Sequence, residues 1–323
     1  MSSNSSISTD YNFSNGLSFI AAVLIAIVGI FGVITNSSIA YIFYKEKSER
    51  SAFNLICVFR SVSNVIILTA TFLFVFFPKI IIGSSLYPPA LESWLIHLSL
   101  SLYLGNEYQI ILVALNRFCA LFAPTYYARI CGLSPTLIAL ILMYSYRIFK
   151  LIVELIPQTA KNCYTCFSTE LLSWVYDPNP DCAFEDDILQ VILYTFITMT
   201  FINVVTFLKI IKFQPKEYNG KGNGKRIRRN ILLFFQTILQ DSLYLIDLTF
   251  TFKLSGLSTH RFWTFVSGTF VWECIHSIDG FIMIMFNERL SFLKKRFQQP
   301  TPSISLAGRL KTVAVSNTLP SVG

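Results

Sequence analysis

The chain has 323 residues, of which 53% are apolar and only 14% are charged, and its formal net charge is +8. Soluble domains usually carry about 25% charged residues. The composition therefore excludes an ordinary soluble domain and favours a protein that sits in a lipid bilayer. The positive charge requires no nucleic-acid partner, because basic loops that face anionic lipid account for it.

Apolar stretches long enough to cross the membrane recur along the chain. A helix needs about 20 apolar residues to cross ~30 Å of hydrocarbon. Seven stretches meet this length, at 17–44, 53–77, 93–116, 135–157, 187–211, 230–252 and 262–286. Polar residues interrupt the third and the sixth, so a count of six or eight would require one assignment to fail. The predicted fold is an all-α membrane protein, a seven-transmembrane helix bundle over 17–286.

The connections between these stretches carry Lys and Arg unevenly. One side of a seven-span chain receives 19 of the 26 basic residues, the other side receives four, and three fall within spans. Basic residues concentrate in cytoplasmic loops. We therefore expect the N-terminal segment 1–16, which has no Lys or Arg, to lie outside the cell and the C-terminus to lie inside.

Two Asn-x-Ser tripeptides begin at Asn4 and Asn12 and fit the N-glycosylation pattern, which operates on the outer side of the membrane. Asn4 is the better candidate, because Asn12 is close to the membrane. The first apolar stretch is too long for a signal-peptide core, so we interpret it as an uncleaved span.

The longest connection, 158–186 on the predicted outer side, holds Cys163, Cys166 and Cys182. The Cys-x-x-Cys spacing also occurs in zinc sites, but no second pair and no nearby His accompanies it. In an oxidising exterior we expect one disulfide within this loop, with Cys182 as a partner and one cysteine left over. The remaining cysteines are expected to be free thiols: Cys57, Cys119, Cys131 and Cys274.

The end of the third stretch resembles the Asp-Arg-Tyr region of rhodopsin-like receptors. Asn116 and Arg117 are followed by Pro124 and Tyr127 at the spacing of that family. The resemblance implies that Arg117 faces a G-protein cavity. An arginine that extends its charge to the membrane boundary is the alternative. Asn116 replaces the usual Asp, so any resting contact of Arg117 must differ from the family pattern.

Polar residues in other stretches resemble further signatures of these receptors. Asn36 and Asn64 match the first and second helices, and Asp279 stands where the seventh helix usually has Asn. Asp and Asn are thus exchanged between two neighbouring helices, and one carboxylate remains. With Asn106 of the third helix, these residues form a predicted polar core, although each alone also fits a simple helix–helix contact.

Some features depart from the rhodopsin-like pattern. No Cys precedes the third stretch, so the usual loop-to-helix disulfide cannot form, and the sixth stretch has no proline. The seventh stretch has no Lys, which excludes a retinal Schiff base.

Longer strings are similar to nematode serpentine chemoreceptors of class Srx. They lie at 53–60, 235–247, 257–265 and 279–297, and the resemblance extends over 29–297. It implies a chemosensory G-protein-coupled receptor in the plasma membrane of sensory neurons. Its expected partners are a small-molecule ligand, a heterotrimeric G protein and the lipid bilayer.

In a receptor bundle, a ligand pocket in the outer half would be lined by Ser99, Tyr103, Tyr244, Asp247, Trp272 and Glu273. The high aromatic content fits a small, largely apolar odorant.

Catalysis has little support in the sequence. His97, His260 and His276 have no metal-ligand spacing, and no nucleophile or phosphate-binding motif appears, so we expect no enzyme, metal or cofactor. A transporter or channel remains the alternative, because ionisable residues within or near spans could mark an ion path. These are Glu107, Arg147, Lys150, Asp241, Asp247, Glu273 and Asp279. The chain shows no internal repeat, which favours the receptor.

Two further expectations concern the fourth stretch and the tail. Arg147, Lys150 and Glu154 share one helix face, where Lys150 and Glu154 can pair. After the seventh stretch, 287–299 predicts a short amphipathic helix on the inner leaflet. The segment 300–323 predicts a disordered cytoplasmic tail open to phosphorylation.

Overall fold

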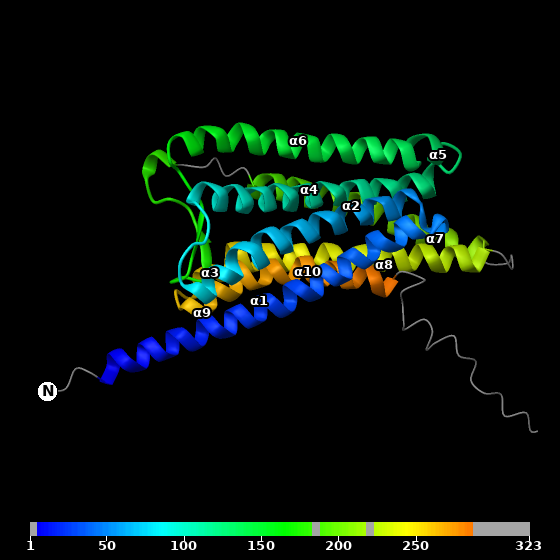
Figure 1. Ribbon diagram of the computed structural model, residues 1–323. Coiled ribbons are helices and arrows are strands. Elements are labelled where there is room, and N and C mark those ends of the chain that lie inside the picture. Colours follow the sequence, from blue (N-terminus) through cyan, green and yellow to red (C-terminus); the bar gives the residue numbers. More distant parts are fainter. Residues whose placement is uncertain (1–4, 183–187, 218–222, 287–323) are drawn as a thin grey trace, which may run out of the picture.

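The computed structural model describes residues 5–182, 188–217 and 223–286. Within these ranges, seven helical segments are long and apolar enough to cross a membrane, and they lie side by side as a bundle (Figure 1). This confirms the predicted seven-transmembrane fold. The segments are Gly16–Lys45, Ala52–Ile82, Pro89–Phe122, Tyr127–Ala160, Ile192–Lys209, Ile231–Leu257 and Arg261–Phe286.

The first three membrane-crossing segments, called rods below, contain most of the polar residues singled out above. They are built from α1 (Ser5–Lys45), a 3-10 turn (Lys47–Glu49), α2 (Ala52–Ile67), a π-helical stretch (Leu68–Phe76), α3 (Phe77–Ile82) and α4 (Pro89–Phe122). Ser51 caps α2 by accepting a hydrogen bond from the Asn54 amide, and Gly83 ends α3 in a left-handed conformation with φ of 79°. Pro78, which cannot donate to the carbonyl one turn earlier, is the second residue of α3 and lies just after the widened π turns.

The second half begins with α5 (Tyr127–Ile130) and α6 (Leu133–Ala160), followed by a hairpin of β1 (Cys166–Ser168) and β2 (Ser173–Val175). A 3-10 turn (Pro180–Cys182) precedes α7 (Ile188–Glu217) and α8 (Asn223–Thr249). Short π and 3-10 turns (Phe250–Leu254, Ser255–Leu257) end the sixth rod. The seventh consists of α9 (Arg261–Thr264), a π stretch (Phe265–Phe270) and α10 (Val271–Phe286).

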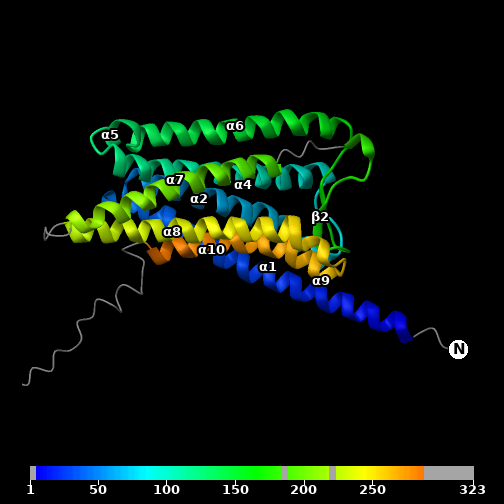
Figure 2. The same cartoon turned by 180° about the vertical axis from the view of Figure 1, so that it is seen from behind.

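The two ends of the bundle differ. The hairpin end carries the start of α1, α3, the β1–β2 hairpin and α9, whereas the α5 end carries α5, the end of α7 and the start of α8 (Figures 1 and 2). The larger apolar cluster includes Ile25, Phe72, Phe76 and Phe265 and lies mostly on the hairpin side. A smaller apolar cluster, which includes Ile56, Val113 and Leu140, lies on the α5 side.

Helix α6 shows how the sequence sorts its faces. Its buried residues form one stripe and include Leu140, Arg147, Leu151 and Leu155. The opposite face exposes apolar side chains such as Phe149, which suits contact with lipid acyl chains rather than water. In contrast, α4 buries residues along most of its length, from Glu92 to Asn116, and is the central rod.

The described chain also bears on the predicted boundaries. Residues 5–16, assigned to an outer segment, continue α1, so Asn12 lies within a helix. Asn4, the predicted amphipathic helix 287–299 and the tail 300–323 lie outside the described residues.

Candidate functional site

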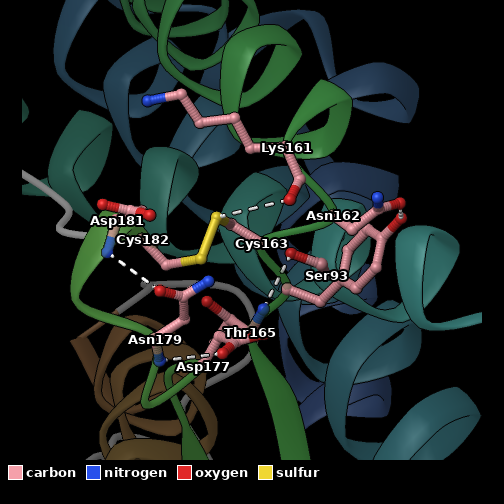
Figure 3. The surroundings of a disulfide bond; sticks show 10 residues. Ser93, Lys161, Asn162, Cys163, Thr165, Asp177, Asn179, Asp181 and Cys182 are labelled. Carbon is pink, nitrogen blue, oxygen red and sulfur yellow. Dashed lines mark hydrogen bonds between the residues drawn. A yellow bond between two sulfur atoms is a disulfide. The ribbon is translucent and has the colours of Figure 1, made fainter.

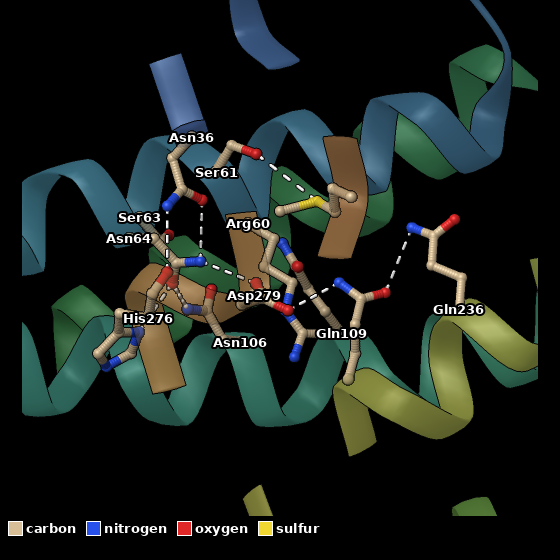
Figure 4. Close-up of polar contacts among 12 residues, drawn as sticks. Asn36, Arg60, Ser61, Ser63, Asn64, Asn106, Gln109, Gln236, His276 and Asp279 are labelled. Carbon is tan, nitrogen blue, oxygen red and sulfur yellow. Dashed lines mark hydrogen bonds and ion pairs between the residues drawn. The ribbon is translucent and has the colours of Figure 1, made fainter. Parts of the chain in front are cut away.

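A buried carboxylate lies at the centre of the bundle (Figure 4). Asp279 on α10 is 1% exposed, and its Oδ2 accepts from Arg60 Nε at 2.9 Å and from Asn64 Nδ2 at 2.8 Å. Its Oδ1 accepts from Gln240 Nε2 at 2.7 Å. A single carboxylate therefore joins α2, α8 and α10.

Asn64 extends this cluster to two more helices. Its amide nitrogen donates to Asn36 Oδ1 on α1 at 3.2 Å, and its Oδ1 accepts from Asn106 Nδ2 on α4 at 2.9 Å. His276 Nδ1 lies 2.8 Å from the same oxygen, and Asn36 Nδ2 donates to the His276 carbonyl at 3.1 Å. The four residues of the predicted polar core thus share one hydrogen-bonded network across five helices.

Tyr144 brings α6 into contact with the network. Its hydroxyl donates to Asn106 Oδ1 at 2.8 Å and accepts from Gln109 Nε2 at 2.7 Å and Ser63 Oγ at 3.0 Å. Gly105 leaves the space for its ring, because a Cβ there would lie 2.7 Å from Tyr144 Cε1.

Close approach of α1 and α10 depends on glycines that precede or follow the polar residues. A Cβ on Gly280 would overlap the Asn36 amide, and a Cβ on Gly32 would overlap the Ser277 side chain. The Asp279-Gly280 pair therefore combines a charge with the room that its partner helix needs.

Sequence reasoning missed Arg60, which it counted only in the charge distribution. Arg60 is 3% exposed. Its guanidinium pairs with Asp279 and also lies 4.8 Å from the Tyr244 ring centroid. Two signals could have found it: an arginine within an apolar span is costly unless it is paired, and Arg60 lies one helical turn before Asn64. Gln240 and His276 were likewise not assigned to the core.

At the α5 end, Arg117 joins α4 to α8. Its two terminal nitrogens donate to Thr237 Oγ1 and to the Leu233 carbonyl. The guanidinium also lies 5.5 Å from the ring centroid of Phe53 and 5.9 Å from that of Phe234.

Asn116 turns away from Arg117 and contacts the loop that follows α4. Its Nδ2 donates to the Cys131 carbonyl at 3.4 Å, and its Oδ1 accepts from the Tyr127 hydroxyl at 3.3 Å. Pro124 lies between α4 and α5. The exchange of Asp for Asn thus leaves Arg117 to bind α8 and gives Asn116 a role in holding α5.

At the hairpin end, Glu92 at the start of α4 holds several elements together. Its carboxylate is paired with Lys79 Nζ at 2.7 Å and accepts from the Phe167 amide at 2.6 Å and from Ser85 Oγ at 2.8 Å. The Phe167 ring stacks on Phe76 with centroids 4.3 Å apart. Glu92 therefore fastens the β1–β2 hairpin to the third span, where the usual disulfide cannot form.

The disulfide lies within the loop itself (Figure 3). Cys163 is bonded to Cys182, with Cα atoms 5.3 Å apart, and Cys166 keeps a free thiol. Burial raises the pKa of that thiol, and the negative charge of Glu92 raises it further. Beside the disulfide, the Thr165 amide donates to Ser93 Oγ at 3.1 Å.

The six predicted pocket residues divide into three groups. Tyr103 donates to Asp247 Oδ2 at 2.8 Å, and its ring lies 5.6 Å from that of Tyr244. Trp272 joins this group through His276, with centroids 6.3 Å apart. Ser99 instead bonds Thr71 at 2.6 Å. Glu273 lies against α1, where its Oε1 would be 3.0 Å from a Cβ on Gly29.

The charged residues of α6 also separate. Arg147 is buried with its guanidinium 6.0 Å from the Tyr108 centroid, whereas Lys150 and Glu154 pair at 3.1 Å on the exposed face.

Comparisons with known proteins agree with this geometry. The family model described as "Serpentine type 7TM GPCR chemoreceptor Srx" matches residues 26–287. Serpentine receptor class X 45 of Caenorhabditis elegans is 23% identical over 296 residues, which cover 84% of this chain and 79% of that protein. The crystal structure of squid rhodopsin superimposes with a TM-score of 0.67 at 12% identity, covering 89% of this chain and 81% of that one.

The rhodopsin likeness establishes the fold, and the family match extends over most of the bundle. The matched family is one of receptors rather than enzymes, and the seven apolar helices make this a multi-pass membrane protein. The chain belongs to the Srx family of serpentine seven-transmembrane chemoreceptors.

Proposed function

We propose that this chain is a chemosensory receptor that binds a small molecule at the hairpin end and activates a heterotrimeric G protein at the α5 end. The observation that carries the proposal is the contact of Arg117 with Thr237 and Leu233. This arginine occupies the position that corresponds to the coupling arginine of rhodopsin-like receptors. Its bonds hold α8 against α4 at the end where a G protein would enter.

The orientation follows from charge and from cysteine chemistry. The connections at the α5 end belong to the side that receives 19 of the 26 basic residues, which suits the cytoplasm. The Cys163–Cys182 disulfide lies at the hairpin end, which suits an oxidising exterior. The segment 1–16 would then be outside, with Asn4 and Asn12 as acceptors of glycans. The chemoreceptor family supports a place in the plasma membrane of sensory neurons.

Helix α8 provides a physical link between the two ends. Asp247 and Tyr244 on α8 contact Tyr103 in the hairpin half. Gln240 contacts Asp279 in the centre, and Thr237 contacts Arg117 near the α5 end. A ligand that shifts α8 at Asp247 would weaken the two inner contacts and open the α5 end to the G protein. In the resting arrangement, α8 is therefore held against α4 and α10 by these contacts.

The test uses the full chain in nanodiscs with a purified Gi-type heterotrimer and measures nucleotide exchange on the α subunit. Wild type should accelerate exchange above empty nanodiscs, and Arg117→Ala should remove that acceleration at unchanged receptor content. Lys253→Ala is the matched control, since it removes a basic side chain at the opposite end of the bundle. Full acceleration by Arg117→Ala would contradict the proposed coupling role.

A transporter or channel is the second candidate, and specific atoms favour it. In the part of the chain that the structure describes, the buried Oε1 of Glu107 and both carboxylate oxygens of Glu273 have no hydrogen-bond partner. Such carboxylates can serve an ion path. Ion flux through proteoliposomes that contain the wild-type chain but no G protein would favour this candidate over the receptor.

A further inference from the structure

Asp247 on α8 is a buried carboxylate with one oxygen unsatisfied. The residue is 5% exposed, and its Oδ2 accepts from the Tyr103 hydroxyl at 2.8 Å. Its Oδ1 has no partner among the described residues. Asp247 takes no part in the ion pairs Arg60–Asp279, Lys79–Glu92 and Lys150–Glu154, so none of these cations neutralises it. A buried carboxylate without a cation is costly, so this position favours the binding of a positive charge.

A second acceptor borders the same tyrosine. His276 Nδ1 lies 2.8 Å from Asn64 Oδ1, an oxygen that can only accept, so Nδ1 carries the proton. The other ring nitrogen, Nε2, is then an acceptor, and it is buried without a partner in the described chain. The His276 ring packs edge-on to Tyr103 with centroids 5.9 Å apart. Two unsatisfied acceptors, one of them charged, therefore flank Tyr103.

Aromatic rings complete the surroundings. Tyr244 lies 5.6 Å from Tyr103, and Trp272 lies 6.3 Å from His276, both measured between ring centroids. Aromatic faces attract cations and accept the apolar body of a ligand. Asp247 lies seven residues after Gln240 on α8, which places it roughly 10 Å along the helix toward the hairpin end from the Asp279 network. Asp247 is thus separate from the Arg60–Asp279 pair, whereas His276 contacts Asn64 of that network and Tyr244 lies against Arg60.

We infer that Asp247 and His276 form a recognition site for a protonated primary or secondary amine on a small organic molecule. The ammonium charge neutralises Asp247, and its N–H groups supply donors for Asp247 Oδ1 and His276 Nε2. A neutral alcohol would leave the carboxylate charge uncompensated, and a quaternary ammonium would have no N–H to donate. This inference rests on the proposed receptor function and specifies the class of ligand. Glu273, which turns to α1, and Ser99, which turns to the π-helical stretch Leu68–Phe76, are not part of the site.

The test compares three probes with one carbon skeleton: 2-phenylethylamine, its N,N,N-trimethyl analogue and 2-phenylethanol. The readout is the Tm of the purified full-length receptor in nanodiscs at millimolar probe concentrations. The amine should raise the Tm of wild type, and the other two probes should do so clearly less. Asp247→Asn should weaken amine binding by about 30-fold or more. Glu154→Gln, the same change on an exposed carboxylate, should leave amine binding intact.

An amine that fails to stabilise wild type, or that does so no better than the alcohol, overturns the inference. Unchanged amine binding by Asp247→Asn also overturns it. Should that variant fail to fold, the ranking of the three probes on wild type decides alone. Nucleotide exchange separates this result from the proposed function. Exchange activity without amine binding would support the proposed receptor function and contradict the amine site. Amine binding without exchange activity would support the amine site and contradict the proposed coupling to a G protein.

Discussion

The Arg60 guanidinium on α2 lies 2.9 Å from the Asp279 carboxylate on α10, and both side chains are almost fully buried. Removing one member of a buried ion pair typically costs about 3–5 kcal/mol, because the other charge is left without compensation. Replacing both members with apolar side chains costs far less. This asymmetry makes the pair testable without knowledge of the ligand.

We expect Asp279→Leu to lower the thermal stability of the detergent-solubilised protein strongly, and the double variant Arg60→Met, Asp279→Leu to recover much of that loss. Asp279→Asn should be milder than Asp279→Leu, because an amide oxygen can still accept from Gln240 or Asn64. Glu154→Leu serves as the control on an exposed face. A double variant no more stable than Asp279→Leu would mean that the two charges do not depend on each other.

Gly280→Ala tests the contact of α1 with α10. A methyl group there would overlap the Asn36 amide, so the two helices must separate or Asn36 must leave the network. Overpacking of this kind typically costs about 1–3 kcal/mol, and the Tm should fall. Gly256→Ala is the matched control, because nothing lies within 4 Å of the position of its Cβ. Equal Tm values for the two variants would show that the helices do not approach as closely as described.

Glu92→Ala tests how the hairpin is fastened. The change removes the pairing with Lys79 and the acceptor for the Phe167 amide. Because charged hydrogen bonds contribute about 1.5–3 kcal/mol each, we expect faster hydrogen exchange at the hairpin amides and earlier proteolysis between β1 and β2. Glu170→Ala, which removes an exposed carboxylate from the same loop, should change neither. Unaltered hydrogen exchange at the hairpin amides of Glu92→Ala would mean that apolar contacts, such as that of Phe76 with Phe167, hold the hairpin in place.

The three loop cysteines should differ in their response to alkylation and to substitution. Because burial and Glu92 raise the pKa of Cys166, less thiolate is present at pH 8 than for a free cysteine. Alkylation of Cys166 in the folded protein should therefore be slow at pH 8 and accelerate only at higher pH. Cys166→Ser should have the stability of wild type. Cys182→Ser should lower the free energy of unfolding by about 3 kcal/mol, as expected for a disulfide whose cysteines are 19 residues apart. Equal losses for both variants would indicate that the pairing is different.

Much of the fold could be predicted from the sequence, because a bilayer imposes a simple rule on helix length. The seven predicted spans coincide with the observed rods, and the extra turns are at their ends, where loops leave the hydrocarbon. Asn36, Asn64 and Asp279 could be placed together because each occupies the position of a known receptor signature, and Asn106 was expected to face the same point from the third helix.

The remainder depends on which way side chains turn, and sequence spacing alone does not fix that. Arg60 and His276 have no counterpart in the signatures that were compared, so their bonds to Asp279 and Asn64 became visible only with the helices packed. Glu273 lies next to Trp272 in sequence, yet it turns to α1 because Gly29 leaves room for it there. The partner of Cys182 also required the folded loop, because two cysteines three residues apart were equally eligible.

In the resting receptor, α8 is kept in position by contacts with Asp279 and with Arg117. Arg117 is also the proposed coupling residue, so the contact with Asp279 is the one whose loosening should favour coupling. Gln240→Leu removes the bond to Asp279 Oδ1 and leaves Arg117 with Thr237 and Leu233 in place. The decisive measurement is ligand-free nucleotide exchange on the G protein by Gln240→Leu, with Gln190→Leu on the exposed face of α7 as the control. We predict that Gln240→Leu raises basal exchange at least twofold above wild type, while Gln190→Leu matches wild type. Basal exchange by Gln240→Leu that equals or falls below wild type, at equal amounts of folded receptor, would contradict the account.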